Sequence, residues 1–180
     1  MREFEIERLL TAVAAAGVGE ERSGGGIQLS LTQPEDPFML AVYEAVRREE
    51  MAQWGWDETA AVSFIAMQYD MQQRSYAMHY PESKLFTVLI QGATVGKLHV
   101  ADDLEAVTLV DVALLPQYQG QGLGTALVRG LQRYVQEARK PLRLTANAGS
   151  RASRLYEKLG FRILEANEVV SRMEWQETGY

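Results

Sequence analysis

The stretch that decides the fold runs from Leu114 to Leu127 and reads LLPQYQGQGLGTAL. It follows a nearly all-apolar run at 106–115, and such a run predicts a central strand that is covered on both faces. Pro116 ends that strand, three alternate glycines follow, and apolar residues at helical spacing begin at Leu123. The sequence therefore predicts a buried strand, a glycine-rich loop and a helix in direct succession.

The loop and the first turn of this helix predict a binding site for an anion. The first backbone N–H groups of a helix have no partner within the helix, and they carry the positive end of its dipole. Gly120, Gly122 and Gly124 would let a pyrophosphate approach the backbone closely. No lysine follows Gly124, so the segment is not a P-loop, and the residues at 141–144 do not continue it as a Rossmann unit.

Outside this stretch, periodicity predicts alternating helices and strands. Upstream we expect helices over 3–16, 38–53 and 58–79 and strands over 27–32, 85–90 and 95–101. Downstream we expect helices from 123 and over 151–159, and strands over 142–146, 161–164 and 168–175. Met67, Met71 and Met78 fall on one face of the helix at 58–79, and we expect them in the core.

A triple glycine at 24–26 divides the chain into an N-terminal helix with its joint, 1–26, and a main domain, 27–180. The helix would either pack on the surface of the domain or act as a dimerisation or regulatory arm, so a homodimer stays open.

The uncharged run at 9–19 is too short to span a bilayer. Acidic residues precede that run, unlike the basic start of a secretory signal, so we expect a cytoplasmic protein with no membrane partner.

The composition of the 180 residues excludes several classes of function. The chain has no cysteine, which excludes disulfides, thiolate metal sites and cysteine nucleophiles. Its histidines are His79 and His99, so a multi-histidine metal centre has few ways to form and no metal is expected. The net charge of −6 and the lack of a basic stripe argue against a nucleic-acid partner and suit a cationic substrate such as an amine.

Two motifs resemble the GCN5-related N-acetyltransferase (GNAT) superfamily. The segment 119–124, QGQGLG, is similar to its pyrophosphate signature Gln/Arg-x-x-Gly-x-Gly/Ala, and Gln117 would begin a second register of the same signature. The segment 152–161, ASRLYEKLGF, looks like its closing motif Ala-x-x-Leu-Tyr-x-x-Leu-Gly-Phe. The expected order of elements agrees from Ile27 to Trp175.

The resemblance implies an α/β (α+β) protein of the GNAT fold. That fold has a central mixed, mostly antiparallel sheet of about six to seven strands and about four helices, to which this chain adds its N-terminal helix. The resemblance also implies acetyl-CoA as co-substrate and transfer of its acetyl group to a primary amine of a small molecule or peptide. The alternative is a catalytically weak acyl-CoA-binding or sensor protein of the same fold.

In that family the thioester lies along the strand before the loop, and a tyrosine that matches Tyr156 protonates the sulfur. Members often place an asparagine six or seven residues before this tyrosine, where this chain has Ser150 and Gly149. Asn147 or Ser150 would take over its contact. The implied coenzyme-binding residues are Val112, Ala113, Leu114, Gln119, Gly120, Gln121, Gly122, Leu123, Gly124, Thr125, Asn147 and Ser150.

A general base and an acceptor wall remain to be assigned. Asp111 lies in an apolar strand, where a carboxylate is costly unless it is paired or used, so it is our candidate for the base. Glu105 and His99 are weaker candidates, and pairing with a neighbour is the alternative for Asp111. Two tryptophans and four carboxylates crowd 49–58, where relatives build the acceptor wall. We expect Glu50, Trp54 and Trp56 to bind a cationic acceptor there, or else to pack a helix corner.

Overall fold

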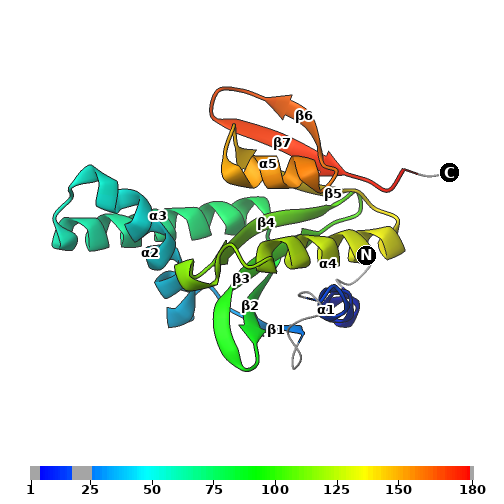
Figure 1. The fold of residues 1–180 in the computed structure, drawn as a ribbon, viewed down its shortest axis with the longest axis horizontal. Helices are drawn as coiled ribbons and strands as arrows, with labels where there is room; N and C mark the ends of the chain where they lie inside the picture. The colour runs from blue at the N-terminus through cyan, green and yellow to red at the C-terminus, as the bar shows by residue number, and fades with distance from the viewer. Residues whose placement is uncertain (1–4, 18–25, 179–180) are drawn as a thin grey trace.

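The computed structural model describes residues 5–17 and 26–178 (Figure 1). The helices in this part are α1 (Ile6–Ala15), α2 (Pro37–Met51), α3 (Glu58–His79), α4 (Leu123–Ala138) and α5 (Arg151–Lys158), with short 3-10 turns at Ala52–Trp54 and Pro116–Tyr118. The strands are β1 (Ile27–Thr32), β2 (Lys84–Ile90), β3 (Ala93–Asp102), β4 (Val107–Leu114), β5 (Leu142–Asn147), β6 (Arg162–Ala166) and β7 (Val170–Trp175). None of these helices combines the length and the apolar character that crossing a bilayer would require.

The strands of the described residues form a seven-stranded sheet in the order β1-β2-β3-β4-β5-β7-β6. Strands β4 and β5 run parallel, and every other described neighbour pair runs antiparallel. The apolar strand β4 therefore lies at the centre of a mixed, mostly antiparallel sheet. This confirms the expected fold class, and the predicted elements agree with the observed ones to within a few residues.

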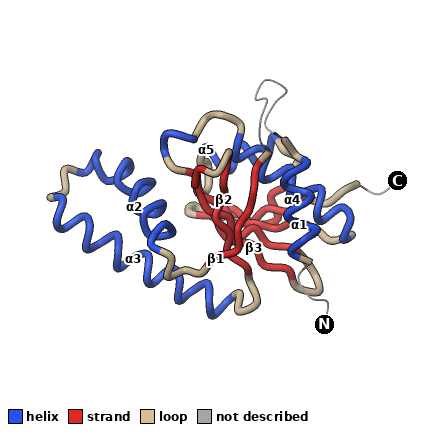
Figure 2. Tube along the Cα trace, turned by 90° about the horizontal axis from the view of Figure 1, so that it is seen from below, coloured by secondary structure: helices blue, strands red, loops and turns tan. Residues whose placement is uncertain are grey.

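Helices cover both faces of the sheet, with α2 and α3 on one side and α1 and α4 on the other (Figure 2). Side chains alternate between the two faces along a strand. On β3, Leu98 and Val100 belong to the main apolar core together with Leu127 of α4. Lys97 and His99 of the same strand are equally buried but polar, and they face the side of α2 and α3. One face of the sheet is thus an apolar core and the other carries buried polar groups.

The N-terminal helix α1 packs on α4. Leu9 and Val13 are fully buried and belong to the main core, and Gly130 on α4 provides the space for the Val13 backbone. A Cβ atom at Gly130 would lie 2.7 Å from Val13 Cα, which is closer than real Cβ contacts. The helix is therefore seated on the domain through a close backbone approach. The glycines at 24 and 25, predicted to form a joint, lie outside the described residues.

The expectation that the methionines of α3 lie in the core is wrong. Met67, Met71 and Met78 are 53%, 62% and 78% exposed, and among the described residues of α3 only Ile65 is buried. Helices α2 and α3 form a hairpin that projects from the sheet, so much of α3 has no second layer above it (Figure 2). Apolar side chains occur around most of α3, and this distribution does not specify which face is covered.

We predict that Gly130→Ala lowers the free energy of unfolding by about 1–3 kcal/mol, because the added methyl group forces α1 away from α4. Gly124→Ala, on the same helix, is the matched control, since a Cβ there would meet no described atom within 4 Å. The control should leave stability unchanged or raise it by up to about 1 kcal/mol, the helix propensity gained. Urea denaturation measures both. Equal stability of the two variants would mean that α1 is not seated on α4.

Candidate active site

Strand β4 separates from β5 halfway along its length. The ladder between them joins only Val107–Leu109 to Leu142–Leu144. Beyond that point β4 stays paired to β3 as far as Leu114, while β5 stays paired to β7 as far as Asn147. The facing edges of Val110–Leu114 and Thr145–Asn147 therefore diverge (Figure 1). A diverging strand edge can offer N–H and C=O groups to a ligand. Val112, Ala113 and Leu114 lie on this edge.

A bulge in β4 precedes the separation. His99 pairs with Asp111, but the next residue of β3, Val100, pairs with Leu109, so Val110 is an extra residue. An extra residue in one strand changes which face the following side chains point to. Leu109 accordingly belongs to the apolar core, whereas Asp111 contacts Lys97 on the side of α2 and α3. The bulge thus places a carboxylate on the polar face of the sheet.

The glycine loop leads directly from β4 into α4. Gly120 and Gly122 have φ values of 70° and 82°, in the left-handed region where glycine is favoured. A Cβ atom at Gly122 or Gly124 would meet no described atom within 4 Å, so the backbone at the start of α4 is open. The loop is braced from within, because Gln119 Nε2 donates to the Leu114 carbonyl at 3.0 Å and Gln121 Nε2 donates to the Gln117 carbonyl at 2.8 Å. Leu123 is buried and Thr125 half-buried just beyond it.

Helix α5 places Tyr156 close to the polar face. The ring is 8% exposed and packs at a tilt on Phe161, with 5.6 Å between centroids. Burial, followed by the charge of Asp111, raises the pKa of the Tyr156 phenol to about 12. The phenol therefore keeps its proton at neutral pH and is a hydrogen-bond donor. The side chain of Ser150 caps α5 by accepting from the Ser153 N–H at 3.1 Å, and Asn147 is exposed at the end of β5.

Asp111 is paired with a lysine that sequence reasoning missed. Lys97 Nζ lies 2.8 Å from Asp111 Oδ2, and its side chain is only 3% exposed. The same ammonium lies 5.5 Å from the ring centroid of Tyr43 and 5.8 Å from that of Tyr69. The ion pair satisfies the requirement that a carboxylate at this position be paired. One signal in the sequence could have indicated a polar partner for Asp111. Strand β3 has polar residues two positions apart, Lys97 and His99.

His99 lies beside this ion pair and is neutral. It is 6% exposed, its Nε2 is 2.7 Å from Ser83 Oγ, and its ring meets Tyr76 edge-on with 5.3 Å between centroids. Burial lowers the pKa of His99 to about 4. The negative charge of Asp111 opposes this shift, and the positive charge of Lys97 adds to it. At neutral pH the imidazole is therefore uncharged, and its lowered pKa makes it a weak base.

The predicted acceptor residues lie elsewhere, around the tip of the α2–α3 hairpin. Trp54 and Trp56 are 61% and 45% exposed, and Trp56 packs on Phe64 with 5.0 Å between centroids. Glu50 pairs with Arg47 at 3.2 Å. Trp54 follows Tyr43 by 11 residues, a helical rise of about 16 Å, so the structure does not bring the tip together with the ion pair. Glu105 is exposed in the turn before β4, 3.9 Å from Arg143.

Comparisons with known proteins agree with this geometry. Residues 39–177 match a family model described as an acetyltransferase (GNAT) domain. No curated protein sequence matches the chain. Among solved structures, the PaiA N-acetyltransferase of Thermoplasma acidophilum in complex with coenzyme A is 15% identical, over 84% of this chain and 99% of that one, with a TM-score of 0.61.

Two further solved structures share the fold at similar identity. A GNAT family acetyltransferase from Elizabethkingia anophelis with acetyl-CoA bound is 15% identical over 83% of this chain and 97% of that one, with a TM-score of 0.54. The spermidine/spermine N-acetyltransferase SpeG of Vibrio cholerae, in mutant forms, is 15% identical over 84% and 94%, with a TM-score of 0.53. At this identity the similarity is one of fold.

We predict that His99 makes stability fall as the pH drops from about 6.5 to about 4. In this window the unfolded chain protonates the imidazole and the folded protein does not, so the unfolded state binds more protons. The shift corresponds to roughly 3 kcal/mol at most. Urea denaturation across this window should show a shallower pH dependence for His99→Asn than for the wild type. His79→Asn, at an exposed histidine, is the control and should follow the wild type; parallel curves for all three proteins would refute the assignment.

Proposed function

The chain belongs to the acetyltransferase (GNAT) family, and on this premise we propose that it transfers the acetyl group of acetyl-CoA to a primary amine of a small molecule or peptide. The observation that carries the proposal is the separation of β4 from β5 between the open glycine loop and Tyr156. We propose that this separation provides a free strand edge for the coenzyme, that the glycine loop provides the anion site, and that Tyr156 provides the proton. Each of these meets one requirement of acetyl transfer.

The coenzyme is proposed to bind along β4. Its pyrophosphate would receive backbone N–H groups from 120–125, at the positive end of α4. Its pantetheine amides would hydrogen-bond to the free edge of β4, as an added strand does, and so bring the thioester beside Val112, Ala113 and Leu114. Gln119 and Gln121 would hold the loop in shape through their bonds to Leu114 and Gln117. The two similar structures that contain coenzyme A or acetyl-CoA make this coenzyme the one to test.

In the reaction the amine nitrogen attacks the carbonyl carbon of the thioester. A C–N bond forms and the C–S bond breaks, while the nitrogen loses one proton and the sulfur gains one. The Tyr156 phenol donates its proton to the departing sulfur; after turnover the proton accepted from the nitrogen is released to solvent, from which Tyr156 regains one. Asp111, kept next to the ammonium of Lys97, is the proposed acceptor of the amine proton, directly or through water.

The polar face below α2 and α3 is the proposed entry for the acceptor. Gln72 Oε1 is buried there and accepts no hydrogen bond from any described residue, one helical turn from Tyr76. A buried acceptor without a donor is costly, and an amine N–H would satisfy it. Contact with Glu50, Trp54 and Trp56 as well would require an acceptor long enough to reach the hairpin tip. A polyamine or a peptide has that length, so both belong among the amines tested.

The experiment is acetyl-CoA turnover, read as thiol release, against short monoamines, spermidine and a peptide with a free N-terminus. Amine-dependent release supports the proposal, and higher activity with the long acceptors would support the role of the hairpin tip. Binding of acetyl-CoA with no turnover on any amine would favour the alternative of an acyl-CoA-binding or sensor protein. The cytoplasmic location and a homodimer remain proposals beside this function.

We predict that Tyr156→Phe lowers kcat by about 10²-fold, because the proton donor to sulfur is lost. The Kd for acetyl-CoA should change by less than about twofold, since the interaction is made mainly in the transition state. Tyr134→Phe is the control, because Tyr134 is also buried but its hydroxyl donates to Asp102 at 2.7 Å. Steady-state kinetics and calorimetry measure the two quantities. A Tyr156→Phe rate within about twofold of the wild type would remove Tyr156 from the mechanism.

A further inference from the structure

A pyrophosphate at the glycine loop would lack a positively charged partner from the loop itself. The sequence from 114 to 128 contains neither lysine nor arginine, and the whole chain carries a net charge of −6. The family signature allows arginine at its first position, but this chain has Gln119, whose Nε2 already donates to the Leu114 carbonyl. Backbone N–H groups are therefore what the loop offers, and a cation for the pyrophosphate would have to come from another segment.

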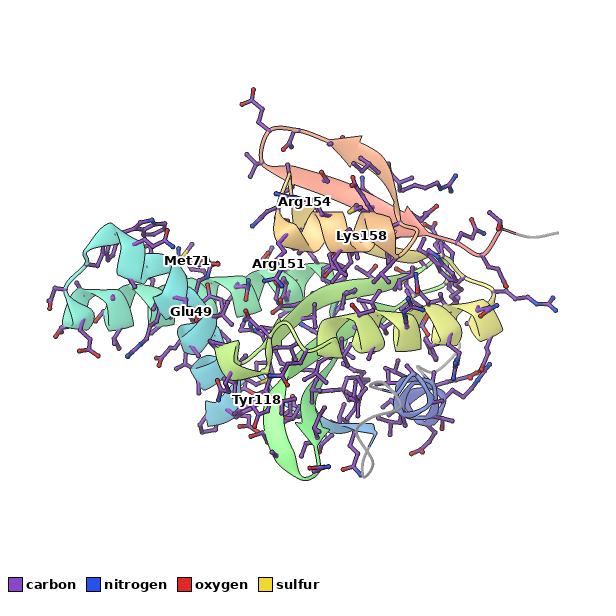
Figure 3. All side chains as sticks on the ribbon, in the orientation of Figure 1. Glu49, Met71, Tyr118, Arg151, Arg154 and Lys158 are labelled. Atoms are coloured by element: carbon purple, nitrogen blue, oxygen red, sulfur yellow. The ribbon has the colours of Figure 1, made fainter. Side chains whose placement is uncertain are left out.

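Arg151, the first residue of α5, lies next to the loop. Its Nη2 is 4.0 Å from the position that a Cβ atom on Gly120 would occupy, and Gly120 is a loop glycine with left-handed backbone. The side chain is exposed and lies on the side of α5 that faces β4 (Figure 3). Within the described residues it forms no salt bridge.

The other cations of α5 are less suited to this role. Arg154 Nη2 donates to the Gly149 carbonyl at 3.0 Å and so braces the turn before the helix. Lys158 is the last residue of α5, seven positions beyond Arg151 and about 10 Å further along the helix axis. Of the three, Arg151 is the one whose charged group reaches the loop.

We propose that Arg151 binds the diphosphate of the coenzyme across the gap between β5 and the loop, as its charged partner. The proposal rests on the proposed function and adds to it a residue outside both family motifs. A guanidinium can donate two parallel N–H bonds to phosphate oxygens, and such charge-assisted bonds are stronger than neutral ones. Arg151 would thus join α5 to the loop before α4 through the ligand.

The test compares Arg151→Ala with the wild type on three probes by calorimetry and kinetics. Coenzyme A carries both the diphosphate and the 3′-phosphate, dephospho-coenzyme A keeps only the diphosphate, and S-acetylpantetheine has neither. We expect Arg151→Ala to raise the Kd roughly 10- to 100-fold for the first two, as one lost charge-assisted contact predicts. The KM for S-acetylpantetheine should stay within about twofold of the wild type, and Arg151→Lys should fall between them for both coenzymes.

Arg133→Ala is the matched control, since Arg133 is an exposed arginine on α4 and its loss changes the net charge equally. It should bind all probes like the wild type. An unchanged Kd in Arg151→Ala overturns the proposal. A loss that disappears with dephospho-coenzyme A also overturns it, because Arg151 would then contact the 3′-phosphate. An equal loss with S-acetylpantetheine would mean that Arg151 acts on the fold. A wild type that binds no coenzyme would overturn the proposed function as well.

Discussion

The candidate site depends on the separation of two parallel strands at the centre of the sheet. After Leu109, β4 keeps its hydrogen bonds to β3 and gives up those to β5, while β5 keeps its bonds to β7. Gly96 of β3 allows β4 to stay paired closely to β3, because a Cβ at this position would lie 2.3 Å from the Ala113 carbonyl oxygen. Each strand remains held on one side, so the free edges between them are rigidly placed. A rigid free edge can receive an extended ligand at low entropic cost.

The bulge at Val110 connects this separation to the chemistry of the two faces. Because it reverses the alternation of side chains, the same strand contributes Leu109 to the apolar core and Asp111 to the polar face. The apolar face, with α1 and α4, supplies the stability of the fold. The polar face, with α2 and α3, contains the Lys97–Asp111 ion pair and the neutral His99. We therefore propose that the coenzyme binds and the amine reacts at neighbouring parts of one strand.

The sequence predicted what depends on neighbouring residues and missed what depends on register. The glycine loop and the start of α4 were predictable, because the residues 116–124 are consecutive and their conformations are set locally. The pairing of Lys97 with Asp111 depends on the offset between β3 and β4, which a single bulge decides. The burial of Met67, Met71 and Met78 was predicted wrongly, since it depends on how far the α2–α3 hairpin extends beyond the sheet. The position of Trp54 at the tip of the hairpin also depends on how far the hairpin extends.

Hydrogen–deuterium exchange of the full chain with and without acetyl-CoA tests most directly whether the free edge of β4 receives the coenzyme. We predict slower exchange in peptides that cover 110–125, because the ligand would bond to amides of the strand edge, the loop and the first turn of α4. Exchange at the hairpin tip, 52–58, should not change. Unchanged exchange throughout 110–125 under conditions where acetyl-CoA is bound would contradict the assignment and place the coenzyme elsewhere on the fold.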